Sequence, residues 1–325
     1  MTLVKTKQLP QRSHLEFSPV SGWSIGVIAI ALLIATPLIA VVAGAFGNLG
    51  DDTASDIWTH LATTVLPSYI ANSLGLMVGV GIGVLVLGVS TAWLVTMCTF
   101  PGWQLFEWAS LLPLASPAYL LAYTYTDFLE YFGPVQTTLR TLFGWQSATD
   151  YWFPDVRSLG GAIVLFSLVL YPYVYMLARV AFQEQSLCTL EASRSLGCTP
   201  WRSFFTVALP LARPAIAAGT ALALMETLND FGTVEYFSVP TFTTGIYRTW
   251  LGMGERLAAT QLASVLLLFI AVLIALERFS RRQARYYQAV GNQPCFSRFH
   301  LTGLRAIAAL LTCALPITLG LLLPG

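Results

Sequence analysis

Charged side chains are scarce in this sequence. Asp, Glu, Lys and Arg make up 10% of its 325 residues, against roughly 25% in a typical soluble domain. Such a chain cannot cover a water-facing surface of its own, and a formal net charge of +1 gives no reason to expect nucleic acid as a partner. Hydrophobic residues reach 56% and the mean hydropathy is +0.68. The composition therefore indicates an integral membrane protein.

Catalytic and metal-binding motifs are also missing. The five Cys form no CxxC pair and no metal-finger spacing, and the three His are far apart in the sequence. No nucleophile–base pair or metal cluster is apparent, so we expect no catalytic residue and no metal site. The phosphate-binding pattern GxxxxGK[ST] is absent as well, so we do not expect this chain to hydrolyse ATP. The first apolar run is too long for a cleavable signal peptide.

Long apolar runs dominate what is present. A bilayer core about 30 Å thick needs roughly 20 apolar residues per helix. Seven runs meet this requirement, at about 23–47, 71–97, 104–126, 159–182, 212–231, 259–278 and from 304 to the last residue. We therefore predict an all-α, polytopic protein with about seven membrane helices. Five glycines in the second run predict close helix packing: Gly75, Gly79, Gly81, Gly83 and Gly88.

Lys and Arg are distributed unequally between the two sides of these runs. Thirteen lie in the leader 1–22 and in the regions after the fourth and sixth runs, and four lie on the other side. This asymmetry predicts a cytoplasmic amino terminus. On the outer side we predict an amphipathic surface helix in 56–70 and another interfacial helix near 133–144, within the aromatic-rich segment 127–158.

The segment 186–213 interrupts the apolar pattern on the cytoplasmic side. Its residues predict a short helix that Gly197 ends, followed by a second helix that Thr199 caps and Pro210 closes. Trp201, Phe204, Phe205 and Ala208 would form one apolar face of the second helix. Two short, individually capped helices joined by a fixed turn suggest a rigid docking element, although a solvated connector is the common alternative.

The spacing in this segment resembles the EAA loop of binding-protein-dependent ABC importer permeases. Its elements are Glu191-Ala192-Ser193, Gly197, Val207 and Leu209-Pro210, in which Ser193 and Val207 replace the usual Ala and Ile. The resemblance implies a type I importer permease fold in a bacterial inner membrane. It also implies an ATPase-coupling loop that includes Glu191, Ala192, Ser193, Gly197, Trp201, Leu209 and Pro210. The implied partners are a cytoplasmic ABC ATPase dimer, which would hold ATP and Mg, and a periplasmic solute-binding protein.

Acidic residues near the outer end of the fifth run provide a hypothesis for the solute. Glu226 and Asp230 are four residues apart, which predicts one helix face, and intramembrane acids often face a cavity. The pair could instead be satisfied by Asn229 or by Arg248. The segment resembles the ferric-iron branch of the family, and Glu226, Asn229, Asp230, Glu235 and Tyr236 are the candidate pathway residues. Oxygen ligands suit ferric iron, but thiamine permeases resemble this region too.

One EAA loop is found where ferric-type permeases commonly have two. We therefore interpret 23–280 as one permease half, 281–303 as a basic linker and 304–325 as the start of a second half. The chain would be either a fragment of a fused permease or a half that pairs with another subunit. Rival hypotheses are an ATP-independent secondary transporter or channel, which gives no reason for the two capped helices, and a scaffold role for a fragment.

Overall fold

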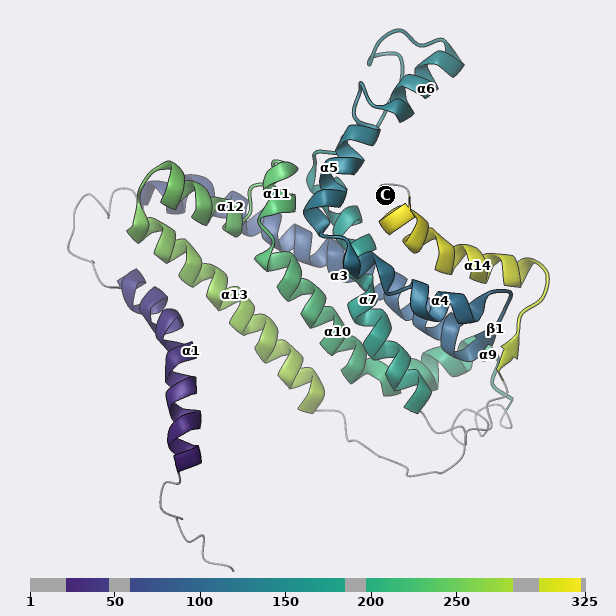
Figure 1. Ribbon diagram of the computed structural model, residues 1–325, viewed down its shortest axis with the longest axis horizontal. Coiled ribbons are helices and arrows are strands. Elements are labelled where there is room, and N and C mark those ends of the chain that lie inside the picture. Colours follow the sequence, from purple (N-terminus) through teal and green to yellow (C-terminus); the bar gives the residue numbers. More distant parts are fainter. Residues whose placement is uncertain (1–21, 47–58, 185–196, 283–297, 323–325) are drawn as a thin grey trace, which may run out of the picture.

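The computed structural model describes residues 22–46, 59–184, 197–282 and 298–322, and almost all of them are helical (Figure 1). Six described helices are long and apolar enough to cross a membrane. A bent pair of shorter helices raises this number to seven if it counts as one span. The predicted all-α, polytopic fold is confirmed.

Three long helices form the centre of the described bundle: α3 (Leu66–Met97), α7 (Leu159–Glu184) and α10 (Leu209–Asn229). Each of the three packs against the other two, and α3 and α7 have the most extensive contact. Four large aromatic side chains of α7 are almost fully buried: Phe166, Tyr171, Tyr175 and Phe182. The core of the protein therefore lies along α7.

Glycines allow these helices to approach closely. A Cβ atom added at Gly88 of α3 would lie 2.7 Å from Val174 Cβ and 2.9 Å from the Tyr171 carbonyl oxygen of α7. A Cβ at Gly219 of α10 would lie 2.8 Å from the Val174 Cα of α7. Gly81 points elsewhere, where the nearest atom would be Leu224 Cδ2 at 3.7 Å. The predicted close packing is confirmed where an added Cβ would lie within 3.2 Å of a residue of α7, at Gly75, Gly79, Gly83 and Gly88, whereas Gly81 has room for a side chain.

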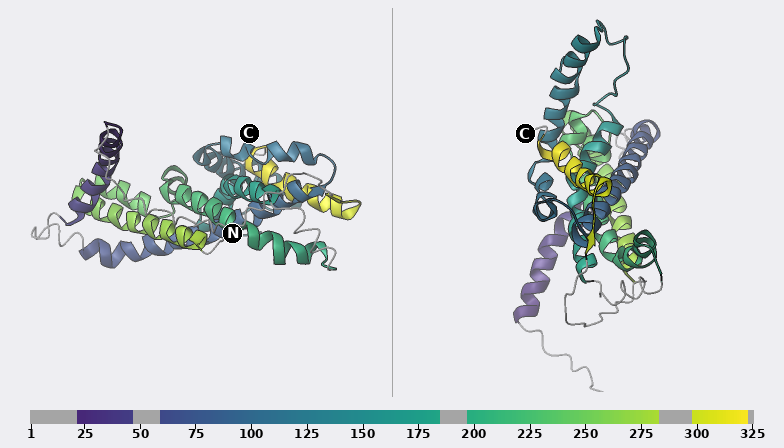
Figure 2. Two further views of the ribbon diagram at one scale, coloured as in Figure 1. Left: turned by 90° about the horizontal axis from the view of Figure 1, so that it is seen from below. Right: turned by 90° about the vertical axis from the view of Figure 1, so that its right-hand side faces the viewer.

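Shorter elements and two peripheral helices complete this part of the described bundle. After α10 the chain continues through α11 (Gly232–Tyr236), α12 (Phe242–Tyr247), the π-helix η4 (Arg248–Gly252) and α13 (Arg256–Arg282). The first helix, α1 (Gly22–Phe46), contacts α13 at the edge of the bundle, and its most apolar stretch contains no buried residue (Figure 2). The first apolar run is thus a helix that the described part of the protein leaves largely uncovered.

The third apolar run is not one helix, as the sequence predicted. It is divided into α4 (Trp103–Ala109), the 3-10 helix η2 (Leu112–Ala115) and α5 (Ala118–Leu129), with a bend of 89° after η2. Ser116 has extended backbone angles (φ −93°, ψ 114°), because the ring of the following Pro117 disfavours the helical conformation for the residue before it.

The two predicted outer helices have different outcomes. The helix near 133–144 is confirmed as α6 (Pro134–Phe143), which starts with Pro134 in its first turn and ends at Gly144 with φ +73°. In the other segment, the described residues from Thr59 onward are helical and continue through the π-helix η1 (Leu61–Val65) directly into α3. They extend α3 and do not form the separate surface helix predicted there. The start of that segment lies outside the described residues.

Residues 298–322 pack on the same body. Strand β2 (Phe299–His300) pairs in parallel with β1 (Cys98–Thr99), and His300 Nδ1 lies 2.7 Å from Thr99 Oγ1. The following α14 (Leu304–Ile317) contacts α3 and α4, and the π-helix η5 (Thr318–Leu322) contacts α7. The Arg298 guanidinium lies 3.8 Å from the centroid of the Trp103 ring. The described part of 304–325, the segment predicted to begin a second half, therefore packs on the same helical bundle.

Candidate functional site

The candidate coupling loop is described only from Gly197 onward. Glu191, Ala192 and Ser193 lie outside the described residues, and so does the first of the two predicted short helices. We refer to residues 197–210 as the coupling segment. They comprise the turn at Gly197, α9 (Pro200–Ser203), the π-helix η3 (Phe204–Ala208) and the first two residues of α10.

The start of the coupling segment agrees with the prediction. Gly197 is exposed and has φ +83°, a backbone conformation that favours glycine. The Thr199 hydroxyl oxygen accepts a bond from the Arg202 N–H at 3.4 Å, and the Thr199 carbonyl accepts one from the Ser203 N–H at 2.9 Å. Pro200 occupies the first helical position, where its missing N–H costs nothing.

Pro210 does not end the helix, contrary to the prediction. The chain stays helical from Pro200 to Asn229. Proline cannot donate to the carbonyl four residues earlier, and its ring clashes with that carbonyl in a regular helix. The wider π-turn before Pro210 changes the bonding pattern, and Leu209 N–H donates to the carbonyl of Phe204 five residues earlier. The coupling segment and α10 therefore form one continuous helical element.

The aromatic residues of the coupling segment lie on two strips, not on one face. Phe204 and Ala208 point inward and are buried. The Phe204 ring lies 4.7 Å from Trp93 of α3 and 6.4 Å from Phe182 of α7, centroid to centroid. Trp93 also contacts Phe182 edge-on at 5.4 Å. This aromatic cluster fixes the coupling segment to the two central helices.

The outer strip remains available for contact. Trp201 is 73% exposed and Phe205 57% exposed, and their rings stack with centroids 6.2 Å apart. The spacing of these residues explains why two are exposed and two are buried. Trp201 and Phe205 are i, i+4 neighbours on one strip of the helix, and residues 204 and 208 are i, i+4 neighbours on the next strip. An apolar hollow of about 1070 Å³ lies beside this strip, between α3, the coupling segment and α14. Leu209 and Pro210 are half-buried.

At the other end of α10, Glu226 and Asp230 do not share a helix face. The helix ends at Asn229, and Asp230 has extended backbone angles (φ −68°, ψ 131°). The Asp230 carboxylate accepts bonds from the Thr233 N–H at 2.8 Å and the Thr233 hydroxyl at 3.2 Å. From the position before the N-cap residue Phe231, Asp230 thus accepts N–H groups of the first turn of α11, including that of Val234. Glu226 and Asn229 remain exposed on α10.

Glu235 and Tyr236 are held by other contacts. Arg248 donates to both carboxylate oxygens of Glu235, at 3.1 and 3.0 Å. Arg248 therefore pairs with Glu235 and not with Glu226 or Asp230. The Tyr236 ring lies 5.0 Å from the Arg157 guanidinium and 5.8 Å from the Tyr123 ring of α5.

Of the five candidate pathway residues, Glu226 alone offers a carboxylate that has no hydrogen bond or ion pair within the described part of the chain. Within the same residues, no group of three His, Cys, Asp or Glu is placed to hold a metal ion. Sequence reasoning also missed the half-buried ion pair between Arg179 of α7 and Glu107 of α4. The sequence signals this ion pair only by an acidic residue in the third apolar run and an arginine near the end of the fourth.

Comparisons with known proteins agree with this architecture. Residues 103–286, more than half of the chain, match the family described as "Binding-protein-dependent transport system inner membrane component". The molybdenum transport system permease protein ModB of Escherichia coli K12 is 31% identical over 207 residues, which cover 61% of this chain and 87% of that protein. The Fe(3+)-transport system permease protein FbpB 2 of Haemophilus influenzae is 27% identical over 223 residues, which cover 68% of this chain and only 39% of the longer relative.

A solved structure shows the same fold. The chain is similar to one in the crystal structure of a bacterial ABC transporter that imports the polysaccharide alginate, with a TM-score of 0.62 and 17% identity. The similarity covers 81% of this chain and 96% of the other. The match over α4 to α13, the helical bundle and the permease relatives lead to one conclusion: the chain belongs to the binding-protein-dependent transport system inner membrane component family, the permeases of ABC transporters.

Proposed function

We propose that the chain is a membrane-spanning permease half of an ATP-driven importer, and that its coupling loop docks on a cytoplasmic ATPase dimer. One observation carries this proposal: a continuous helix from Pro200 to Asn229 joins the coupling segment to the far end of α10. At about 1.5 Å per residue, this element is about 45 Å long, enough to cross a bilayer. A displacement of the coupling segment would therefore move the end that carries Glu226.

The exposed pair of Trp201 and Phe205 supports docking on a partner. Aromatic side chains are enriched among the residues that dominate binding energy at protein interfaces. The buried Phe204 on the adjoining strip would transmit a force on this pair to α3 and α7 through Trp93 and Phe182. ATP and Mg would be held by the partner subunits, because this sequence contains no phosphate-binding loop of the GxxxxGK[ST] type.

The arrangement of the helices supports a cytoplasmic position for the coupling segment and for the amino terminus. Figure 1 shows α9 and the final turns of α7 and α13 on one side of the bundle, and α6, α11 and α12 on the other. Arg179, Arg202, Arg278 and Arg282 belong to the first side, in agreement with the excess of Lys and Arg in cytoplasmic regions.

A complete pathway would need a second permease half, supplied by another part of a longer chain or by another subunit. We propose ferric iron as the solute, delivered by a solute-binding protein. The unpaired Glu226 carboxylate and the neighbouring Asn229 carbonyl oxygen support a cation, since ferric iron prefers oxygen ligands, and one relative transports Fe(3+). These two oxygen ligands alone would bind an ion weakly, as a transport pathway that must release its solute requires. Thiamine, another cation, remains an alternative within this proposal.

A molybdenum-containing anion is the second candidate, because the ModB relative has the higher sequence identity. The two candidates differ in the sign of their charge, and Glu226 distinguishes them. The permease, reconstituted with its ATPase and a second half, would be tested for ATP-dependent uptake of ⁵⁵Fe(III), ⁹⁹Mo-molybdate and ³H-thiamine. We expect iron uptake that falls in the Glu226→Gln variant. Molybdate uptake that rises in this variant would replace the cation proposal. Uptake that continues without ATPase subunits would refute the importer and favour a secondary transporter.

A further inference from the structure

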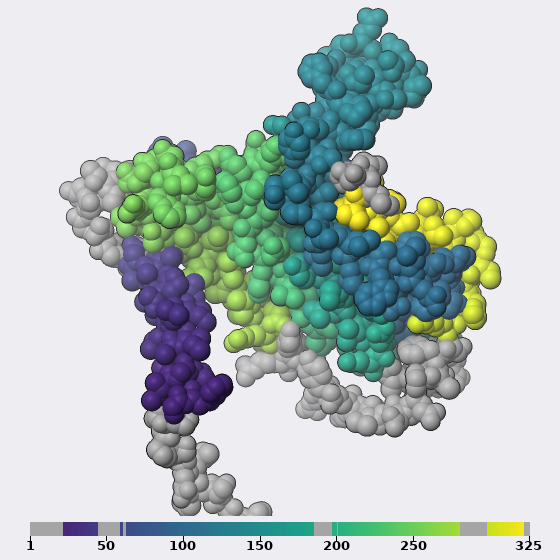
Figure 3. Space-filling model, in the orientation of Figure 1, coloured from purple at the N-terminus to yellow at the C-terminus, as the bar shows by residue number. Residues whose placement is uncertain are grey.

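A group of charged residues lies where α4, the end of α7 and the start of the last described segment meet. It consists of Glu107 of α4, Arg179 of α7 and Arg298, which directly precedes β2. Figure 3 shows the surface of α4 between the surfaces of α14 and of the last turns of α7. We call these three residues the arginine cluster. No step of the proposed transport function uses it.

Glu107 is held against α7 by its backbone and by its side chain. The buried Tyr175 hydroxyl donates to the main-chain carbonyl of Glu107 at 2.9 Å. Arg179, one turn later on α7, forms an ion pair with the Glu107 carboxylate. The side chains of this pair are only 22% and 24% exposed. The pair is therefore fixed in position and partly shielded from water.

Arg298 lies along the same face of α4. Its guanidinium carbon is 3.8 Å from the centroid of the Trp103 ring. Trp103 and Glu107 are i, i+4 neighbours on α4, and the Cβ atoms of such neighbours are about 5–6 Å apart. Arg298 and Arg179 therefore lie on adjacent turns of one helix face, close enough for their like charges to repel. The arginine cluster contains two positive charges and one negative charge.

Each arginine also has a nitrogen atom that lacks an acceptor. Arg179 Nε and Arg298 Nη1 are buried, and neither has a hydrogen-bond partner among the described residues. A buried donor on a charged group is costly to leave unpaired, and native structures rarely contain one without a reason. Two such donors on neighbouring guanidinium groups, together with an excess of positive charge, indicate an acceptor that is itself an anion.

The depth of the arginine cluster indicates the class of anion. Arg179 follows Leu159, the first residue of α7, by 20 positions, which is about 30 Å of helix and about the thickness of a bilayer core. Arg179 therefore lies at the level where lipid phosphates begin, and the ring of Trp103 is typical of this interface. The planar guanidinium group matches phosphate oxygens, and one tetrahedral phosphate can accept from two arginines together.

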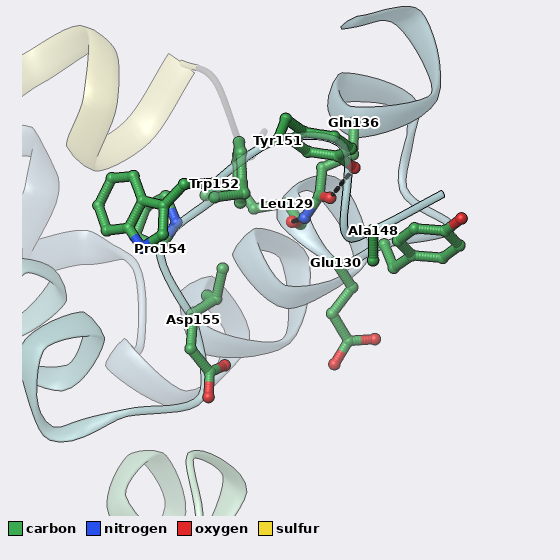
Figure 4. Close-up of a pocket in the computed structure, with 11 residues that line it drawn as sticks. Leu129, Glu130, Gln136, Ala148, Tyr151, Trp152, Pro154 and Asp155 are labelled. Atoms are coloured by element: carbon green, nitrogen blue, oxygen red, sulfur yellow. Dashed lines mark hydrogen bonds between the residues drawn. The ribbon is translucent and has the colours of Figure 1, made fainter. Parts of the chain in front are cut away.

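A pocket at the opposite end of α7 does not have these properties. It has a volume of about 360 Å³, and Glu130 and Asp155 are among the residues that line it (Figure 4). Both carboxylates already have partners within the chain. The Arg157 side chain is paired with Glu130 at 2.8 Å, and the Arg157 backbone N–H donates to Asp155 Oδ1 at 3.1 Å. The pocket therefore offers no comparable reason to bind an ion.

We propose that Arg179 and Arg298 together bind a phosphate-bearing anion, which is either the headgroup of an anionic phospholipid or free inorganic phosphate. Glu107 would orient Arg179, and its negative charge would limit the affinity for the anion. The bound phosphate would tie Arg298 to α4 and α7, and with it β2 and α14. The site depends neither on the identity of the transported solute nor on the ATPase.

The test uses the full chain, purified in detergent. It is titrated separately with phosphatidylglycerol, with zwitterionic phosphatidylcholine and with sodium phosphate at constant ionic strength. The shift of the thermal unfolding midpoint gives a half-maximal concentration for each. We expect phosphatidylglycerol or phosphate to raise the midpoint, and Arg298→Gln to raise the half-maximal concentration about ten-fold. The matched control Arg305→Gln removes an exposed cation of α14 and should leave this concentration unchanged.

Glu107→Gln provides a second measurement with the opposite sign. It removes the carboxylate that repels the anion, so we expect a lower half-maximal concentration even though the variant itself unfolds more easily. A purely structural role of the arginine cluster would not produce this gain in affinity. If Arg298→Gln does not fold, Glu107→Gln alone decides, and an unchanged or higher half-maximal concentration would overturn the proposal.

The ligand that acts identifies the source of the phosphate. A response to phosphatidylglycerol, to phosphate or to both supports the site. The proposal is overturned if neither shifts the midpoint, or if phosphatidylcholine acts at the same concentrations as phosphatidylglycerol. Equal increases of the half-maximal concentration in Arg298→Gln and Arg305→Gln would also overturn it, because they would show a general effect of surface charge.

Discussion

Replacement of Gly197 by alanine tests the backbone conformation of the turn at the start of the coupling segment. Gly197 has φ +83°, and a Cβ atom at this position would meet nothing within 4 Å. Gly144, at the end of α6, has φ +73° and equally open surroundings. An L-residue in the left-handed region costs about 1–2 kcal/mol. Alanine at either position therefore has a similar backbone cost and adds no steric clash, but only Gly197 lies in the coupling loop.

The cost at Gly197 lowers the fraction of molecules whose turn has the docking geometry. A cost of about 1–2 kcal/mol lowers the ratio of molecules with the docking geometry to molecules without it by a factor of about 5 to 30. We therefore expect Gly197→Ala to weaken binding of the ATPase subunits to nanodisc-embedded permease about 5- to 30-fold, while Gly144→Ala leaves this affinity unchanged. Biolayer interferometry with immobilised nanodiscs measures both. Equal affinities for wild type and Gly197→Ala, or equal losses in the two variants, would refute the reasoning.

Three further predictions concern the helix contacts and the turn at Asp150. Gly88→Ala should destabilise the protein by about 1–3 kcal/mol in a denaturant titration, because its methyl group would overlap Val174 of α7, whereas Gly81→Ala should have little effect. Glu107→Ala should cost about 1–3 kcal/mol in the same assay, since it leaves the half-buried Arg179 unpaired; unchanged stability would contradict this. The N–H groups of Ser147 and Gln146 hold the pKa of Asp150 below its ordinary 3.8. These two N–H groups should therefore be protected from hydrogen exchange above pH 3.8. They should lose that protection as the pH falls through the lower folded pKa, and equal protection in Asp150→Asn would argue against the capping role.

Much of the helical architecture could be predicted from the sequence. The apolar runs that became α1, α3, α7, α10 and α13 are long, and the bilayer requires helices of that length. The turn at Gly197 and the start of α9 could also be predicted, because Gly, Thr and Pro act locally on the backbone.

Three errors occurred where one local signal overrode another, and a fourth depended on packing against distant residues. Pro210 indicates a helix end, but a π-turn before it kept the helix continuous. Pro117 broke the third run, in which hydrophobicity alone suggested one span. The spacing of Glu226 and Asp230 predicted a common face, but Asp230 binds the first turn of the next helix. Which strip of the coupling segment becomes buried depends on Trp93 and Phe182, and no pattern within the segment contains that information.

The central claim is that the coupling segment lies in the cytoplasm and is covered by the ATPase. Cys198, next to Gly197 and half-buried, allows a direct measurement. In a variant that keeps only this cysteine, a membrane-impermeant maleimide should label Cys198 in inside-out vesicles and not in right-side-out vesicles. Bound ATPase subunits should then protect it. Labelling from the outside, or equal labelling with and without the ATPase, would contradict the account.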